Sequence, residues 1–162
     1  MKLNKEKLVY RKIDCSDISL SVDYRIMFLT ELQGYQPKEK ETQLRIELTE
    51  YFKQAIAFNS YIGWVAEYNS KPVGFGGIVI QKIPGHFEYV KGLKGYILNM
   101  FTIPEYRQNG ICHNILKRLI SNGKELRLNS IYLHATNEGI DLYRKEGFSD
   151  SEWPVLELTM KI

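Results

Sequence analysis

The sequence predicts a mixed α/β fold in a single domain, residues 1–162, with the element order β-α-α-β-β-β-α-β-α-β. The chain has 162 residues, of which 44% are hydrophobic and 25% charged, as is ordinary for one globular domain. Apolar residues recur at helical spacing in some segments and form β-favouring runs in others. Clusters of glycine, proline, asparagine and aspartate separate these segments, so that helices and strands are mixed along the chain.

The N-terminal third predicts one strand and two helices. The short, partly alternating run 8–13 is the expected first strand. Apolar residues at helical spacing predict a helix over 22–32, and Gly34 is placed to end it. Pro37 is a favourable first residue for a second helix, in which apolar residues recur as far as Phe58.

A β-hairpin is expected next. The runs 61–68 and 73–82 favour strands, and the Asn-Ser-Lys-Pro segment between them favours a turn. Glycines in the second run indicate either room for a ligand or close packing of the backbone at a bulge, and the sequence leaves both interpretations open. These glycines are Gly74, Gly76 and Gly77.

The centre of the chain predicts a strand, a short loop and a helix. Residues 96–103 form an apolar, β-favouring run that Pro104 ends, and a polar loop follows up to Gly110. From Ile111 the apolar residues fall at helical spacing. The loop therefore lies at a helix N-terminus, where free amides and the helix dipole favour phosphate groups. The segment matches neither a Walker loop nor the GxGxxG pattern of dinucleotide-binding folds.

The C-terminal part predicts a strand over 130–135, a helix over 138–146 capped by Asn137, and a last strand over 153–162. Gly147 is placed to close the helix. The last strand rests on a partial alternation of apolar residues, which are Val155, Leu156, Leu158 and Met160.

Composition argues against several classes of protein. The net charge of +3 is too mild to indicate nucleic-acid binding. No apolar run approaches the ~20 residues of a membrane span, and the N-terminus does not resemble a signal peptide. Cys15 and Cys112 make no disulfide framework, which favours reduced thiols in a cytoplasmic protein. The three histidines match no zinc spacing, so no metal is expected.

Two motifs carry a resemblance to a known family. Arg107-x-x-Gly110-x-Cys112, after a strand and on a helix, resembles the pyrophosphate loop of the GNAT family, the GCN5-related N-acetyltransferases. The family usually has Gly or Ala where this chain has the small residue Cys112. The segment 131–148 is similar to the family's later strand and helix, and it ends in the LY-xxx-GF signature. The clear resemblance covers residues 95–148.

The resemblance implies a single N-acetyltransferase domain with a mixed, mostly antiparallel sheet that is splayed at the central strand and flanked by helices. It also implies acetyl-CoA as the co-substrate, bound at the splay. The residues expected at the cofactor are Phe101, Thr102, Ile103, Arg107, Gln108, Asn109, Gly110, Ile111, Cys112, His113, Asn137 and Tyr143, with Phe101 and Ile103 expected to contact the pantetheine through their main chains.

The implied reaction is direct attack of a primary amine on the thioester, with Tyr143 as the general acid. Many relatives carry a glutamate base where this chain has Asn99, and an amide takes no proton at neutral pH. A relaying water, a substrate that arrives deprotonated, or another side chain would then serve. Asn99 could still hold the substrate or a water. The side chains considered for the base are Glu31, Glu67, Glu88 and Tyr96.

The acceptor expected from the resemblance is a small-molecule or peptide amine, and the family also makes a homodimer an option. Four glutamates in the second predicted helix weakly favour a cationic acceptor. The alternative is a non-catalytic module that binds or senses acyl-CoA. The absent strand glutamate favours that alternative, whereas Asn137 and Tyr143 favour the enzyme. The glutamates are Glu39, Glu41, Glu47 and Glu50.

Overall fold

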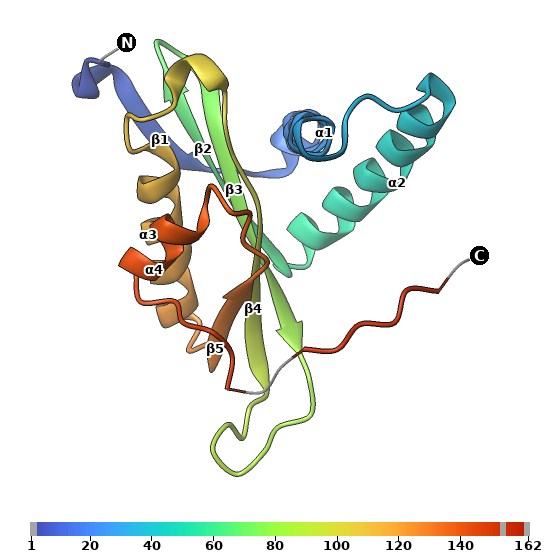
Figure 1. The fold of residues 1–162 in the computed structure, drawn as a ribbon, viewed down its shortest axis with the longest axis vertical. Coiled ribbons are helices and arrows are strands. Elements are labelled where there is room, and N and C mark those ends of the chain that lie inside the picture. The colour runs from blue at the N-terminus through green and yellow to red at the C-terminus, as the bar shows by residue number, and fades with distance from the viewer. Residues whose placement is uncertain (1–2, 153–154, 161–162) are drawn as a thin grey trace.

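The computed structural model describes residues 3–152 and 155–160, which form a five-stranded sheet with helices on both faces (Figure 1). The strands follow chain order, and their bounds are β1 Leu8–Lys12, β2 Tyr61–Tyr68, β3 Lys71–Lys82, β4 Leu93–Thr102 and β5 Ser130–Leu133. The helices are α1 Ile18–Gln33, α2 Lys38–Ala57, α3 Ile111–Glu125 and α4 Ile140–Lys145. The first four strands pair antiparallel and β5 joins β4 in parallel, which confirms the predicted mixed, mostly antiparallel sheet.

Two apolar clusters hold the layers together, one on each face of the sheet. The apolar stripe of α3 packs on one face, where Ile115, Leu116 and Leu119 are completely buried, as its helical spacing predicts. On the other face, residues of α1 and α2 such as Tyr24 and Phe52 pack against the sheet. Figure 1 shows α3 and α4 on one side of the strands and α1 and α2 on the other.

The sheet splays open between β4 and β5. The two strands pair only over Lys94–Ile97 and Ser130–Leu133, whereas β4 continues to Thr102. Beyond Ile97, the edge of β4 that faced β5 therefore has no strand beside it among residues 3–152. This confirms the predicted splay at the central strand, and it leaves main-chain groups of β4 open on that side.

A bulge in β4 explains the glycines of β3. Gly77 pairs with Leu98 and Phe75 with Phe101, so Gly76 faces two residues, Asn99 and Met100. A Cβ added to Gly76 would lie 2.5 Å from the Met100 sulfur. Close packing at a bulge is therefore the correct interpretation of these glycines, and room for a ligand is not.

Two predicted helix starts are wrong. The first helix begins at Ile18, not 22, because Asp14 and Asp17 form a capping box on the 3-10 turn Cys15–Asp17 just before it. The last helix is the short Ile140–Lys145, with Gly139 and not Asn137 at its N-cap. Asn137 thus lies in the turn before the helix, where its side chain is not used as a cap.

The predicted last strand is absent from residues 155–160, the part of it that the structure describes. Positions 153–154 and 161–162 lie outside the described residues. The segment runs away from β5 (Figure 1), so no sheet edge pairs with it. Alternation alone does not make a strand, because a strand also needs a partner for its backbone groups. The side chains are exposed, at 79% for Val155, 93% for Leu156, 84% for Leu158 and 74% for Met160.

Candidate active site

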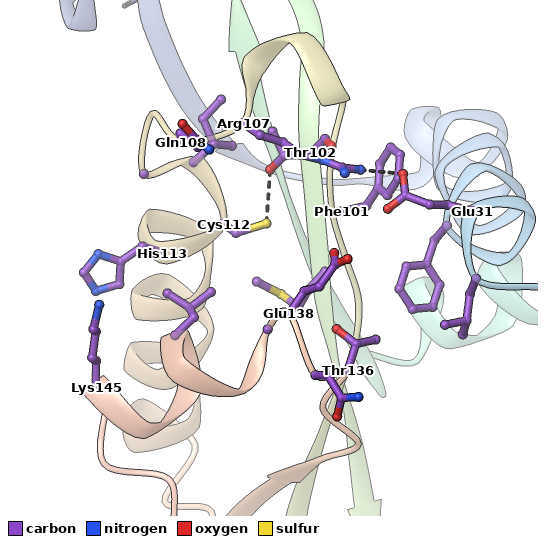
Figure 2. Close-up of a pocket in the computed structure, with 18 residues that line it drawn as sticks. Glu31, Phe101, Thr102, Arg107, Gln108, Cys112, His113, Thr136, Glu138 and Lys145 are labelled. Atoms are coloured by element: carbon purple, nitrogen blue, oxygen red, sulfur yellow. Dashed lines mark hydrogen bonds and ion pairs between the residues drawn. The ribbon is translucent and has the colours of Figure 1, made fainter.

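A cavity of about 820 Å³ lies at the splay. Its walls come from α1, the end of β4, the loop and first turn of α3, and the segment between β5 and α4 (Figure 2). The volume suits a large organic ligand. Nine of the residues expected at the cofactor line it, namely Phe101, Thr102, Arg107, Gln108, Gly110, Ile111, Cys112, His113 and Asn137.

The loop before α3 has a backbone geometry that suits an anion. Gln108 and Gly110 both have left-handed backbone conformations, with φ of 61° and 75°. Such turns direct successive backbone amides into a concave nest, and a non-glycine residue held in this conformation is typical of functional sites. No side chain caps α3, so the amides of its first turn are open toward the cavity.

Three of the expected cofactor residues, Ile103, Asn109 and Tyr143, do not line the cavity. The Asn109 side chain turns back on its own loop, where it donates to the carbonyl of Arg107 at 2.9 Å and accepts from the amide of Leu3 at 3.1 Å. Asn109 therefore shapes the loop. The amide of Ile103 donates to the carbonyl of Val73 at 3.0 Å, and its side chain packs in the core, so its N–H is not available to pantetheine.

Arg107 reaches across the cavity toward α1. Its Nε donates to the carbonyl of Thr102 at 3.0 Å, and its guanidinium forms an ion pair with Glu31, as Figure 2 shows. The sequence suggested Glu31 only as a candidate base. Its pairing with Arg107 was not apparent because the two residues are 76 positions apart.

The thiol of Cys112 lies in the wall of the cavity. Its sulfur is 3.1 Å from the Thr102 hydroxyl, and burial raises the pKa of the thiol more than Thr102 and Arg107 lower it. The thiol is therefore kept protonated, although it lies at a helix N-terminus. His113, the next residue in the first turn of α3, pairs with Glu146 at the end of α4.

Comparison with known proteins identifies the family. Residues 26–148 match the model of the acetyltransferase (GNAT) family. The chain belongs to the GNAT family.

Two solved structures resemble the chain over most of its length. The structure superposes with a TM-score of 0.82 on a predicted acetyltransferase from Clostridium acetobutylicum crystallised with acetyl-CoA, which is 37% identical over 93% of this chain and 96% of that one. A GCN5-related N-acetyltransferase from Ralstonia eutropha JMP134 gives 0.81 at 25% identity, over 96% and 98%.

A curated relative is the uncharacterized N-acetyltransferase YafP of Escherichia coli K12, which is 27% identical over 65% of this chain. The chain spans 59% of the length of that relative.

Tyr143 lies beneath the GNAT cavity and does not line it. It is 9% exposed, and its ring packs edge-on against Phe148 with the ring centres 5.9 Å apart. Gly139, which lines the cavity, lies directly over the ring, since a Cβ there would be 3.3 Å from Tyr143 Cε2. Burial raises the pKa of Tyr143 to about 12, with a smaller contribution from Cys112, so the hydroxyl stays protonated at neutral pH.

Asn99 lies on the α1 side of the sheet, outside the cavity lining. It is 2% exposed, and its Oδ1 accepts a hydrogen bond from Arg25 of α1 at 2.8 Å. Sequence reasoning missed Arg25, because nothing in the local pattern of α1 distinguishes it from a solvated side chain.

The other residues considered for the base are dispersed. Glu67 pairs with Arg11 at 2.9 Å at the far side of the sheet. The Tyr96 hydroxyl is 3.0 Å from His134 Nδ1, and Glu88 lies in the loop between β3 and β4. The structure does not gather these side chains at one point.

The glutamates of α2 do not support a cationic acceptor. None of them lines the cavity, and Glu41 is held by Arg45 at 2.8 Å. Among the residues with described positions, no cluster of three His, Cys, Asp or Glu side chains could hold a metal ion. No helix in the same part of the chain is long and apolar enough to span a bilayer.

Proposed function

We propose that the chain transfers the acetyl group of acetyl-CoA to a primary amine of a small-molecule or peptide acceptor by direct attack. The observation that carries this proposal is the loop 107–113, whose open amides face a cavity at the splay of a GNAT sheet. The acetyl-CoA in the similar Clostridium acetobutylicum protein supports the same co-substrate.

In this proposal the pyrophosphate binds to the amides of the loop and of the first turn of α3. The pantetheine arm follows the open edge of β4 at Met100–Thr102, where its amides replace the missing neighbouring strand. Asn137 lines the opposite wall. The thioester then lies near the β4 bulge, whose unpaired amide is suited to polarise its carbonyl.

The acceptor nitrogen forms a bond to the acetyl carbon, the carbon–sulfur bond breaks, and the ammonium gives up a proton. Tyr143 is the proposed general acid. Its ring lies beneath Gly139, but Cys112 of the cavity wall acts on its hydroxyl, and from this side the hydroxyl would supply a proton to the departing sulfur. Burial raises the pKa of Tyr143 above that of an ordinary thiol. In this proposal the tyrosine therefore gives its proton to the sulfur as the carbon–sulfur bond breaks, and the acceptor's proton restores the tyrosine.

A homodimer belongs to the same proposal. Residues 155–160 place Leu156, Leu158 and Met160 on one side of an extended segment that is fully exposed. The outer edge of β5 has no strand partner among residues 3–152. If residues 155–160 of one chain paired with β5 of a second copy, the contact would cover the apolar side chains of the segment and the open edge of β5.

Calorimetric titration with acetyl-CoA tests the cofactor site. Gly110→Asp places a carboxylate where the pyrophosphate is expected, and binding should weaken by about 100-fold or more through repulsion and lost approach. Gly34→Asp is the matched control, since Gly34 also has a left-handed backbone (φ 78°) and does not line the cavity. Equal affinities of the two variants would contradict the assignment of the loop.

Release of CoA with a panel of amines tests the chemistry. Tyr143→Phe should keep acetyl-CoA affinity and lower kcat by about 10²- to 10⁴-fold. An unchanged kcat would remove Tyr143 from the mechanism. Tight binding by the natural chain without transfer to any amine would favour the non-catalytic acyl-CoA-binding module.

A further inference from the structure

Arg25 carries a half-buried positive charge without a carboxylate partner. The arginines Arg11, Arg45, Arg107 and Arg144 each form an ion pair with an Asp or Glu. Arg25 forms none with any described residue. Its guanidinium donates to Asn99 Oδ1 at 2.8 Å and lies 5.7 Å from the centre of the Phe28 ring. One hydrogen bond uses only part of the five-donor fork of an arginine.

Within the described part of the chain, no carboxylate compensates the charge of Arg25. The ionisable groups that act on it are the hydroxyls of Tyr51, Tyr61 and Tyr96, none of which is a carboxylate, and burial lowers the pKa of the guanidinium. An uncompensated charge in a partly desolvated place is costly. A negatively charged ligand would therefore stabilise the charged Arg25 guanidinium.

Two more polar groups beside Arg25 keep hydrogen-bonding capacity to spare. Asn99 Nδ2 and the Tyr61 hydroxyl are buried, and neither forms a hydrogen bond of standard geometry with a described residue. Asn99 also acts on the Tyr61 hydroxyl, lowering its pKa against the larger effect of burial, so the two groups are neighbours. Arg25, Asn99 and Tyr61 thus form a donor-rich group, which we call the Arg25 cluster.

The Arg25 cluster borders the proposed reaction site. Phe28, on which Arg25 stacks, lines the cavity, and so does Met100, the residue after Asn99 in the β4 bulge. A ligand group bound to Arg25 would therefore lie on the α1 side of the bulge, next to the position expected for the thioester. This is the side from which an acceptor can approach when CoA occupies the splay.

We propose that the Arg25 cluster binds a carboxylate of the acceptor, so that the substrate class is an amino acid or a related amino-carboxylate. This inference rests on the proposed acetyl transfer. One guanidinium matches one carboxylate in charge and in bidentate geometry, whereas a phosphate would call for further cations. The tyrosines and Phe28 give the site an aromatic wall for the rest of the acceptor.

The test compares acceptors in matched sets: an amino acid, its primary amide and the amine formed by removing its carboxyl group. The natural chain should prefer the carboxylate in kcat/KM by about 10- to 100-fold, the range expected for a charge-assisted hydrogen bond. In Arg25→Gln the ratio of kcat/KM for the amino acid to kcat/KM for its neutral analogues should fall at least about tenfold, chiefly through a higher KM for the amino acid. Arg25→Lys, which keeps the charge and loses the fork, should give an intermediate ratio.

Controls separate this inference from the proposed function. Arg45→Gln removes an arginine of α2 that is already paired with Asp23 and Glu41, and it should leave the ratio unchanged. Calorimetry with acetyl-CoA checks that Arg25→Gln is folded. If acetyl-CoA is bound and consumed but neutral amines react equally well, or Arg25→Gln keeps the preference, only the Arg25 assignment is overturned. If no amine is acetylated, both proposals are overturned.

Discussion

At the scale of single residues, Arg107 has two competing partners. In the structure it pairs with Glu31, whereas a bound pyrophosphate would attract the same guanidinium. Glu31 also lines the cavity, so in the proposed complex its negative charge would lie close to the cofactor's phosphates. The Glu31 carboxylate would then compete with the phosphates for Arg107.

Glu31→Gln should consequently bind acetyl-CoA more tightly, by roughly two- to fivefold, because a partly exposed ion pair contributes up to about 1 kcal/mol. Calorimetry at low and moderate salt measures this change, which should shrink as salt screens the charges. Glu47→Gln, on the exposed face of α2, is the control and should bind as the natural chain does. Weaker binding by Glu31→Gln would show that Glu31 instead orients Arg107 for the cofactor.

Cys112 gives a second prediction at this scale. Since burial raises the pKa of its thiol, little thiolate is present at neutral pH, and alkylation should be slow and should accelerate as the pH rises. The exposed Cys15 is an internal comparison within the same sample. Mass spectrometry of the labelled peptides should show slower labelling of Cys112 than of Cys15. Bound CoA should slow Cys112 further, and labelling that CoA leaves unchanged would contradict the place of the loop.

At the scale of elements, the start of α1 depends on Asp17. This side chain accepts two hydrogen bonds from Arg11, at 2.8 and 2.9 Å, and one from the amide of Asp14. These contacts hold the pKa of Asp17 below its usual range, with Arg11 the largest cause. Asp17 therefore joins β1 to the turn that begins α1.

Asp17→Asn should lower the free energy of unfolding by about 1–3 kcal/mol at pH 7. The folded-state pKa is depressed, so the stabilisation is present above the unfolded value near 3.9 and is lost as the pH falls through the folded pKa. Urea unfolding at pH 7 and pH 3 should show the difference between the two chains narrowing in acid. Asp23→Asn, which removes a half-exposed partner of Arg45, should cost less than about 1 kcal/mol at either pH.

The β3–β4 bulge gives the second prediction at the scale of elements. Gly76→Ala would bring a Cβ to 2.5 Å from the Met100 sulfur and 2.7 Å from Ile115 Cγ2, so overpacking should cost about 1–3 kcal/mol. Gly34→Ala meets no atom within 4 Å, and it should cost only the ~1 kcal/mol of a left-handed backbone. Because Met100 also lines the cavity, Gly76→Ala should weaken acetyl-CoA binding as well, whereas Gly34→Ala should not.

At the scale of the whole molecule, the exposed segment 155–160 predicts association. If it pairs with β5 of a second copy, light scattering after size-exclusion chromatography should give twice the chain mass of 18.9 kDa. The double variant Leu156→Asp, Leu158→Asp should be monomeric, because charges on the apolar side would be buried in the interface. Glu157→Gln, between them, is the control and should remain dimeric. A natural chain that is monomeric at about 100 μM would contradict the dimer, since an interface of standard size gives micromolar affinity or better.

The central part of the fold could be predicted because its determinants are local. The spacing from Ile111 to Leu119 sets the buried stripe of α3, and Gly110 just before it sets the left-handed turn of the loop. The strand before the loop and the parallel strand after α3 follow from the same periodicities. These elements carry most of the predicted cofactor site, which explains why nine of its residues line one cavity.

What the sequence determined by itself was therefore the class of fold, the family resemblance and the position of the loop before α3, all of which depend on residues close together in the chain. Tertiary structure alone decided the rest. It joined Arg25 to Asn99 across 74 positions and Arg107 to Glu31 across 76, it buried Tyr143 under Gly139, and it left 155–160 without a sheet edge. The physical reason is that the charge, burial and pairing of a side chain depend on what folding places beside it, and periodicity along the chain does not contain that information.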